Sequence, residues 1–258
     1  GGGKSVVSET IADERHDMGA EIISPFDPKE EFELAYAMFK PEARYHQRSL
    51  YRIGKEQSQK KVKIYHPFTF NLPKNFESAP INIFTIPVTD LGRDEISFIT
   101  ESEGDSEIVR DLNNTINLLG TNDSLYSLIK LIEKRIKGIK KKIAGKDVII
   151  PHASSFFIKS GTTGTQKTVS DIASYFEPFM IDYCIAPKNF KLNIDMKEIL
   201  RDREHYHIFS TKWIKDEKIK YFVAFRIMNM IYENLDYAKY PLVIDLPEIG
   251  SLVPYSPD

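Results

Sequence analysis

Short apolar runs and amphipathic stretches alternate near both ends of the chain. Residues 5–18 contain neither Gly nor Pro and predict a helix, and residues 20–26 predict a strand directly after it. Toward the other end, residues 206–210 and 240–245 predict strands on either side of a long helix over residues 216–235. Such a succession is typical of an α/β fold in which helices flank a mainly parallel sheet.

The middle of the chain has a different pattern. Strands are predicted at residues 62–65 and 81–86, separated by prolines. Apolar residues at helical spacing from Leu125 to Ile139 predict an amphipathic helix, capped by Asn122 or Asp123 and ending in a basic run. We therefore expect three parts, which are the first part of a core (1–60), an insertion or subdomain (61–190) and the second part of the core (191–258).

Composition limits the possible function classes. The chain has 258 residues, 41% of them hydrophobic, which is enough for a full core. Its formal net charge of −2 gives no general attraction to nucleic acid or anionic membrane, so any such binding requires a local patch. Cys184 is the only cysteine and no apolar run is long enough to span a bilayer, which indicates a reducing, cytoplasmic location.

A glycine-rich turn stands directly before the first predicted helix. Glycines allow successive backbone N–H groups to converge on phosphate oxygens, a lysine reaches the terminal phosphates, and a hydroxyl at the first helical turn binds magnesium. This half of a phosphate-binding loop predicts an ATP and Mg²⁺ site; a frayed or added end is the alternative. The predicted cofactor-binding residues are Gly1, Gly2, Gly3, Lys4, Ser5 and Val6.

The partner of such a loop is a buried apolar strand that ends in a carboxylate. Leu242-Val243-Ile244-Asp245 fits this description, and Glu248 follows three residues later. Asp245, together with Ser5, is the predicted magnesium ligand, and Glu248 is the candidate for positioning the attacking water. Lys4, Asp245 and Glu248 form the predicted catalytic set. An ordinary core strand with an Asp in the following turn is the other interpretation.

At this point the chain resembles the FtsK–HerA superfamily of P-loop motor ATPases. In that family the strand after the phosphate-loop helix ends in an Asp-Pro-Lys turn and a glutamate, here Phe26-Asp27-Pro28-Lys29-Glu30. The later order of strand, helix and acidic strand is also similar. The resemblance implies a RecA-like P-loop NTPase core, a homo-oligomeric and usually hexameric ring, and ATP hydrolysis that drives movement along double-stranded DNA, as in conjugation, DNA pumping or genome packaging.

The chain departs from the family pattern after the acidic strand. The family commonly has Glu directly after the strand Asp, whereas Leu246 stands there, so Glu248 is a substitute for the usual catalytic base. Two other function classes remain open at this stage. One is a P-loop ATPase that acts on protein, in secretion or assembly, and the other is a non-enzymatic interaction module.

Four further patterns are candidates for function. Residues 161–168 imitate a phosphate loop, but Gln166 stands where a glycine is needed, so a Thr-rich surface loop is preferred. His205 and His207 alternate on a strand, and a polar strand end is preferred to a metal site. The basic run from Lys137 to Lys146 is either a DNA contact or a solvated helix end. Arg201 and Arg203 are candidates for an arginine finger that reaches a neighbouring subunit.

Overall fold

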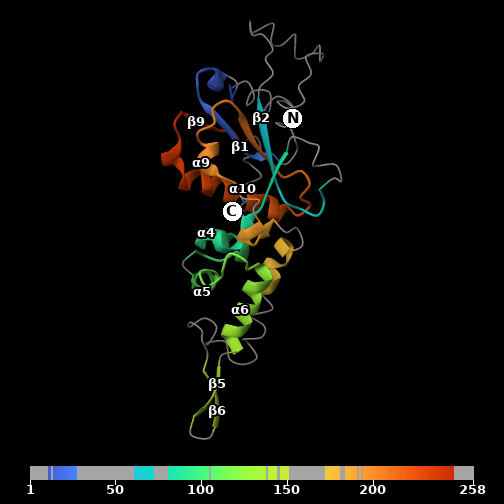
Figure 1. Ribbon diagram of the computed structural model, residues 1–258, viewed down its shortest axis with the longest axis vertical. Coiled ribbons are helices and arrows are strands. Elements are labelled where there is room, and N and C mark those ends of the chain that lie inside the picture. The colour runs from blue at the N-terminus through green and yellow to red at the C-terminus, as the bar shows by residue number, and fades with distance from the viewer. Residues whose placement is uncertain are drawn as a thin grey trace, which may run out of the picture. The chain divides into compact units, whose positions relative to one another are not determined.

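The chain forms two compact units in the computed structural model (Figure 1). The first comprises Gly1–Pro67, Leu72–Ile83 and Asp195–Asp258, and the second comprises Phe68–Asn71 and Phe84–Ile194. The boundaries expected from the sequence lie at 60/61 and 190/191. The structure describes residues 11–12, 14–27, 61–72, 81–104, 106–137, 139–143, 146–150, 172–180, 184–190, 192 and 194–246.

A five-stranded sheet forms the centre of the first unit. Its strand order is β3-β2-β8-β1-β9, and β8 pairs in parallel with both β2 and β1, while β1 also pairs in parallel with β9. This confirms the α/β class with a mainly parallel sheet. The strands are β1 (Glu21–Asp27), β2 (Val62–Pro67), β3 (Ile81–Phe84), β8 (Tyr206–Ser210) and β9 (Leu242–Ile244).

The sheet takes in part of the range expected to be an insertion, because β2 and β3 belong to it. The predicted strand over residues 81–86 is divided at Thr85, whose N–H donates to the carbonyl of Leu192 at 2.7 Å. The following strand, β4 (Ile86–Pro87), pairs with β7 (Ile185–Ala186) in the second unit. A single apolar run therefore supplies strands to two sheets, which hydrophobicity alone does not reveal.

One face of the five-stranded sheet is covered by the N-terminal helix. Residues 11–12 and 14–17 are helical, and Gly19 with φ 95° ends the helix in the left-handed conformation expected of a glycine there. The buried residues on this face form one cluster, to which two half-buried valines also contribute; they are Ala12, Ala20, Ile22, Tyr206 and Ile208, with Val62 and Val243.

Helix α10 (Glu217–Glu233) connects β8 to β9, as the sequence predicts. It begins at Asp216, whose carboxylate accepts the N–H of Ile219 at 3.2 Å and so satisfies one of the free donors of the first turn. The helix packs against β1, where the ring of Tyr221 lies 5.9 Å from that of Phe26. A short helix, α9 (Met196–Ile199), and the turn η4 (Leu235–Tyr237) complete the described part of this unit.

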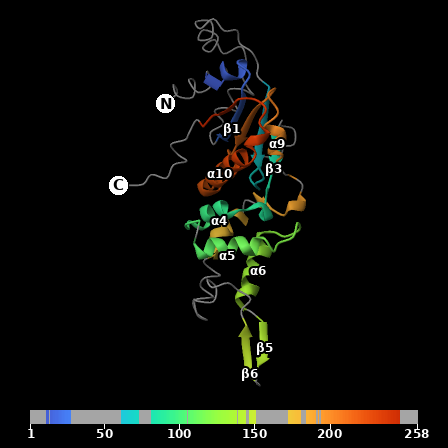
Figure 2. The same cartoon turned by 90° about the vertical axis from the view of Figure 1, so that its left-hand side faces the viewer.

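The second unit is mainly helical in its described part (Figure 2). Helices α4 and α5 pack together, and residues 172–180 are also helical. Buried Ile96, Ile99, Leu112 and Leu128 contribute to the apolar interior. Its elements, besides β4 and β7, are η2 (Val88–Asp90), α4 (Arg93–Thr100), α5 (Glu107–Ile116), α6 (Leu125–Lys137) and η3 (Lys188–Phe190).

The prediction that the helix continues to Ile139 and ends in the basic run is wrong. Helix α6 ends at Lys137, and the lysine-rich residues form β5 (Ile139–Ile143), which pairs antiparallel with β6 (Lys146–Ile150). Gly138 interrupts the helical pattern at the boundary, and isoleucines flank the lysines as in a strand. The predicted cap is also wrong, because Ser124 occupies it and accepts the N–H of Ser127 at 3.4 Å.

No helix in the part of the chain that the structure describes is long and apolar enough to cross a membrane.

Candidate functional site

The carboxyl ends of three neighbouring parallel strands meet at one edge of the sheet. Strand β1 lies between β8 and β9, with Ser24 opposite Ile208 and Ile23 opposite Ile244. Continuing the second pairing by one residue sets Asp245 beside Ser24, on a strand spaced about 4.8 Å away. In open α/β sheets this edge is where ligands bind.

Three buried hydroxyl groups lie along these strands: Ser24 is in the middle of β1, Ser210 is the last residue of β8, and Thr211 follows it. Ser24, Ser210 and Thr211 are each exposed by 2% or less, and within the described residues none of their hydroxyl oxygens has a hydrogen-bond partner. A buried hydroxyl without a partner costs free energy, so such groups are retained where something else supplies the partner. We call Ser24, Ser210, Thr211 and Asp245 the carboxyl-edge cluster.

Asp245 is the acidic member of this cluster. It follows β9 directly, and its backbone N–H donates to the carbonyl of Ile23 at 2.9 Å, so the ladder with β1 continues to this residue. Asp245 is 8% exposed, which fits a carboxylate held at the rim of the sheet. The strand before it, however, is only half-buried, although the sequence predicts a buried one. In the described residues β9 has a neighbour on one side only, which explains its exposure.

The N-terminal helix covers the face on which this cluster lies. Val243 belongs to the core cluster with Ala12, and strand side chains alternate, so position 245 shares the face of position 243. The same alternation places Ser24 with Ile22 on β1. The helix joins β1 through the turn at Gly19.

The other predicted members of the nucleotide site lie outside the described residues. These are Gly1, Gly2, Gly3, Lys4, Ser5, Val6 and Glu248, together with the Thr-rich loop of residues 161–168. Asp245 is therefore the predicted site residue that the structure describes. The sequence interpretation did not identify Ser24, Ser210 or Thr211. A Ser-Thr pair at the carboxyl end of a predicted parallel strand is the signal that could have found two of them.

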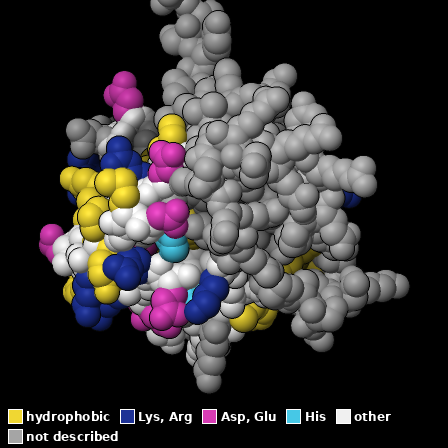
Figure 3. Space-filling view, turned by 90° about the horizontal axis from the view of Figure 1, so that it is seen from above, with side chains coloured by type: hydrophobic (Ala, Val, Ile, Leu, Met, Phe, Trp, Pro, Cys, Tyr) yellow, Lys and Arg dark blue, Asp and Glu magenta, His cyan; other side chains and the backbone are white. Residues whose placement is uncertain are grey.

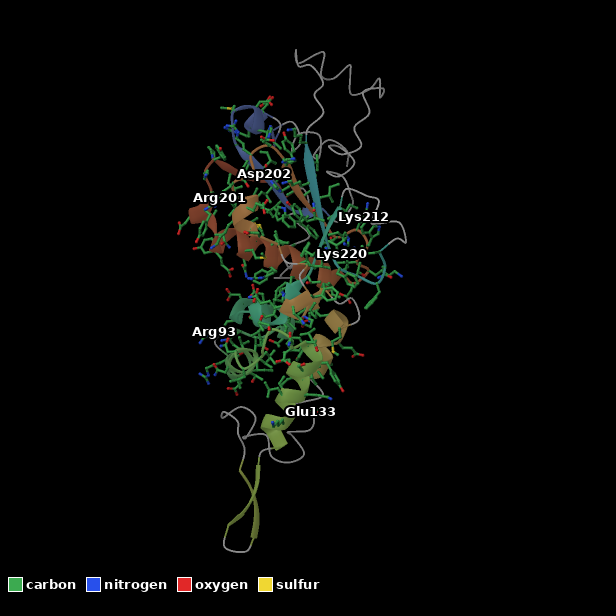
Figure 4. The ribbon with its side chains drawn as sticks, in the orientation of Figure 1. Arg93, Glu133, Arg201, Asp202, Lys212 and Lys220 are labelled. Carbon is green, nitrogen blue, oxygen red and sulfur yellow. The ribbon has the colours of Figure 1, made fainter. Side chains whose placement is uncertain are left out.

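A second polar cluster lies at the amino ends of the strands, around Asp202. Lys63 donates to this carboxylate at 2.6 Å, and Nδ1 of His205 lies 3.0 Å from both of its oxygens. Burial alone would raise the pKa of Asp202, but the hydrogen bonds from His205 and Lys63 lower it to about 2. Figure 4 shows Asp202 beside Arg201 in the loop that follows α9.

His207 belongs to the same cluster and is buried. Its Nδ1 lies 3.0 Å from the hydroxyl of Tyr65, and its Nε2 lies 3.2 Å from the backbone carbonyl of Asp202. This fits a neutral imidazole that accepts from Tyr65 and donates to Asp202. Burial lowers the pKa of His207 to about 4 and raises the pKa of Tyr65, so both remain neutral near pH 7.

Glu21 is a buried carboxyl group in the first position of β1. The residue is fully buried, and within the described residues neither carboxyl oxygen has a hydrogen-bond partner. Burial, and then the charge of Asp202, raise the pKa of Glu21 to about 8, so its neutral form dominates at pH 7. The sequence interpretation did not single out Glu21, because an acidic residue at a strand end is ordinarily exposed.

Arg201 and Arg203 lie on an aromatic surface. The guanidinium of Arg201 is 5.4 Å from the ring of Tyr237, over which Lys197 also lies at 4.2 Å, and that of Arg203 is 5.1 Å from the ring of Tyr240. Figure 3 shows a face on which hydrophobic side chains lie among Lys and Arg. Both arginines precede β8, at the amino end of the sheet, so they stand at the opposite edge from Asp245.

The described residues contain no cluster of three His, Cys, Asp or Glu side chains that could hold a metal ion by themselves. Asp245 and the neighbouring hydroxyls are nevertheless hard oxygen donors, which is the ligand type that magnesium takes together with phosphate and water. Comparisons with protein families, characterised proteins and solved structures found no match to this chain. Inference about function therefore rests on the residues themselves.

Proposed function

We propose that this chain binds and hydrolyses ATP through a P-loop site and belongs to a motor that moves double-stranded DNA. One observation carries the proposal. The strand that follows the predicted phosphate-loop helix pairs directly with the strand that ends in Asp245, and the helix covers the face on which Asp245 lies. In a parallel sheet such neighbouring strands and the helix N-terminus can act on one phosphate ligand beyond the carboxyl ends of the strands.

The packing of Ala12 in one core cluster with Val243 supports the same site. In the proposed site Gly1, Gly2 and Gly3 would supply backbone N–H groups, and Lys4 its ammonium group, to phosphates held near Asp245. The buried hydroxyls at this edge would obtain partners in the bound state.

The residues would divide the chemistry among them. Lys4 would neutralise the terminal phosphates, and Ser5 and Asp245 would hold magnesium directly or through water. Magnesium, when bound, withdraws charge from the phosphate oxygens. Glu248 would position the attacking water in place of a glutamate directly after Asp245. Assembly into a hexameric ring, with Arg201 or Arg203 acting on a neighbouring subunit, belongs to the same proposal.

The proposal is tested by titrating the full chain with a fluorescent ATP analogue and magnesium, and by measuring hydrolysis with and without double-stranded DNA. Lys4→Ala should abolish nucleotide binding, whereas Lys61→Ala, which changes an exposed lysine paired with Glu204, should leave it unchanged. Stimulation of hydrolysis by DNA supports the translocase. Nucleotide binding without that stimulation favours an ATPase that acts on protein, and unchanged affinity in Lys4→Ala overturns the site.

A further inference from the structure

Strands β5 and β6 form a two-stranded antiparallel ribbon that pairs with no third strand in the described part of the chain. Within the second unit, Figures 1 and 2 both show this ribbon extending past the end of α6 and away from α4 and α5. An isolated two-stranded ribbon is only marginally stable in water. A ribbon of this kind is therefore suited to act together with a binding partner. We call α6 residues 134–137 and the ribbon the basic arm.

The basic arm concentrates positive charge in a chain that is slightly acidic overall. Between positions 134 and 146 the sequence carries seven cationic residues and no acidic one. Glu133, labelled in Figure 4 in α6, and Asp147 are the acidic residues on either side. The cationic residues are Lys134, Arg135, Lys137, Lys140, Lys141, Lys142 and Lys146.

The register of the ribbon distributes these charges over both faces. Lys140 lies opposite Ile149, Lys141 opposite Val148 and Lys142 opposite Asp147. Since strand positions alternate, 140 and 142 share one face and 141 lies on the other. Positions 140 and 142 are about 6.8 Å apart along the strand, which is about twice the axial spacing of phosphates along one strand of a duplex.

We infer that the basic arm binds the phosphate backbone of double-stranded DNA. A two-stranded ribbon has the width that enters the major groove, and its lysines would lie against the phosphates that border the groove. No aromatic residue occurs between positions 134 and 150, so the arm lacks the anchors typical of a segment that inserts at a membrane surface. The choice of DNA as the ligand rests on the proposed function. The positive charge and the ribbon geometry of the arm are observed independently of that function.

The test compares DNA binding by three triple variants of the full chain, measured by fluorescence anisotropy on a short labelled duplex without nucleotide. Replacing Lys140, Lys141 and Lys142 by Gln should weaken binding about 10-fold or more at roughly 0.1 M salt. It should also reduce the salt slope, which is the slope of log affinity against log salt concentration, by about 2–3. Replacing them by Arg should preserve binding. The matched control replaces exposed Lys61, Lys215 and Lys239 by Gln and should change affinity less than about 2-fold.

Three results would overturn the inference. The first is a Gln variant that keeps the DNA affinity and salt slope of the parent chain. The second is a Gln variant that binds DNA normally but loses affinity for vesicles that contain phosphatidylserine. The third is a Gln variant that self-associates with unchanged DNA affinity, which would mean that the lysines only protect the ribbon edges. Nucleotide binding is measured separately. If the chain binds DNA through the arm but does not bind ATP, the ATPase proposal is overturned and the inference about the arm stands.

Discussion

The backbone N–H of Asp245 donates to the carbonyl of Ile23 at 2.9 Å, which carries the β1–β9 ladder one residue beyond the end of β9. This bond fixes the backbone of Asp245 directly after β9, beside Ser24 in the middle of β1. A carboxylate attached to a fixed backbone is held in position without rearrangement of its strand. The bond is made by the main chain, so the carboxylate can be altered without removing it.

Asp245→Asn should therefore separate chemistry from folding. The amide is nearly the same size as the carboxylate but carries no charge to hold magnesium, so the rate of ATP hydrolysis should fall at least about 100-fold. The thermal midpoint should change by only a few degrees, about 2–4 °C per kcal/mol. The measurement is magnesium-dependent phosphate release, with a melting curve on the same preparation.

The matched control for that variant is Asp236→Asn. Asp236 is an exposed aspartate in the turn η4, and it should keep the parental rate. If Asp245→Asn hydrolysed ATP as fast as the parent chain, Asp245 would be an ordinary strand-end residue.

Glu21 should make the stability of the protein depend on pH in an unusual direction. The unfolded chain loses the Glu21 proton near the ordinary value of 4.5, whereas the folded chain keeps it to about 8. Between these values the folded state binds the extra proton, so the free energy of unfolding should decrease as pH rises from about 4.5 to about 8. Glu21→Gln should remove this contribution and raise the thermal midpoint at pH 8 by about 3 °C or more.

The measurement for Glu21 is a set of melting curves between pH 4.5 and 8.5 on the parent chain and on two variants. Glu204→Gln is the control, because Glu204 forms an exposed ion pair with Lys61 and should leave the pH dependence unchanged. An unaltered pH dependence in Glu21→Gln would show that the buried carboxyl does not carry the effect.

Asp202 should show the opposite dependence at low pH. Its pKa is held at about 2, below the ordinary 3.8, so the stability it contributes is present above about pH 4 and is lost as pH falls through about 2. Asp202→Asn removes the charge that Lys63 and His205 contact, at a cost of about 1–3 kcal/mol near pH 7. It should also lower the pKa of Glu21, which the Asp202 charge raises.

Comparison of Asp202→Asn with the double variant Asp202→Asn/Glu21→Gln isolates that coupling. In the single variant the decrease of stability with pH should end at a lower pH than in the parent chain, and in the double variant it should be absent. Chemical denaturation at a series of pH values measures both. If the decrease of stability ended at the same pH in the parent chain and in Asp202→Asn, that result would contradict an electrostatic interaction between the carboxyl groups of Asp202 and Glu21.

The strands of the core could be predicted from the sequence because their signals are local. An apolar run between Gly19 and Pro28 predicted β1, a short run of aromatic and β-branched residues predicted β8, and Asp216 marked the start of α10. Asp245 could be identified for the same reason, since it directly follows an apolar strand. The pairing of β1 with both β8 and β9 could not, because it joins segments about 180 and 220 residues apart in a parallel sheet whose strands need long crossovers.

The remaining differences have similar causes. Lys140, Lys141 and Lys142 have good helix propensity, and their place in a ribbon depends on pairing with β6, which a helical periodicity does not register. Ser210 reads as the polar end of a strand, and its burial depends on the elements around that end. Long-range packing thus determines both the formation of the ribbon and the burial of the hydroxyl groups at the candidate site.

Ser210 should show a conflict between stability and function. Its hydroxyl is buried without a partner in the described residues, so Ser210→Ala removes an unsatisfied polar group and should leave the free energy of unfolding unchanged or raise it by up to about 1 kcal/mol. If the hydroxyl faces the bound nucleotide and its magnesium, the same change should weaken Mg-ATP binding about 3- to 10-fold.

Thr100→Val is the matched control for Ser210→Ala. It removes a buried hydroxyl that donates to the carbonyl of Ile96 at 2.8 Å, and should lower stability while leaving nucleotide affinity unchanged. Loss of stability in Ser210→Ala, with parental affinity, would assign the hydroxyl to packing and remove it from the proposed site.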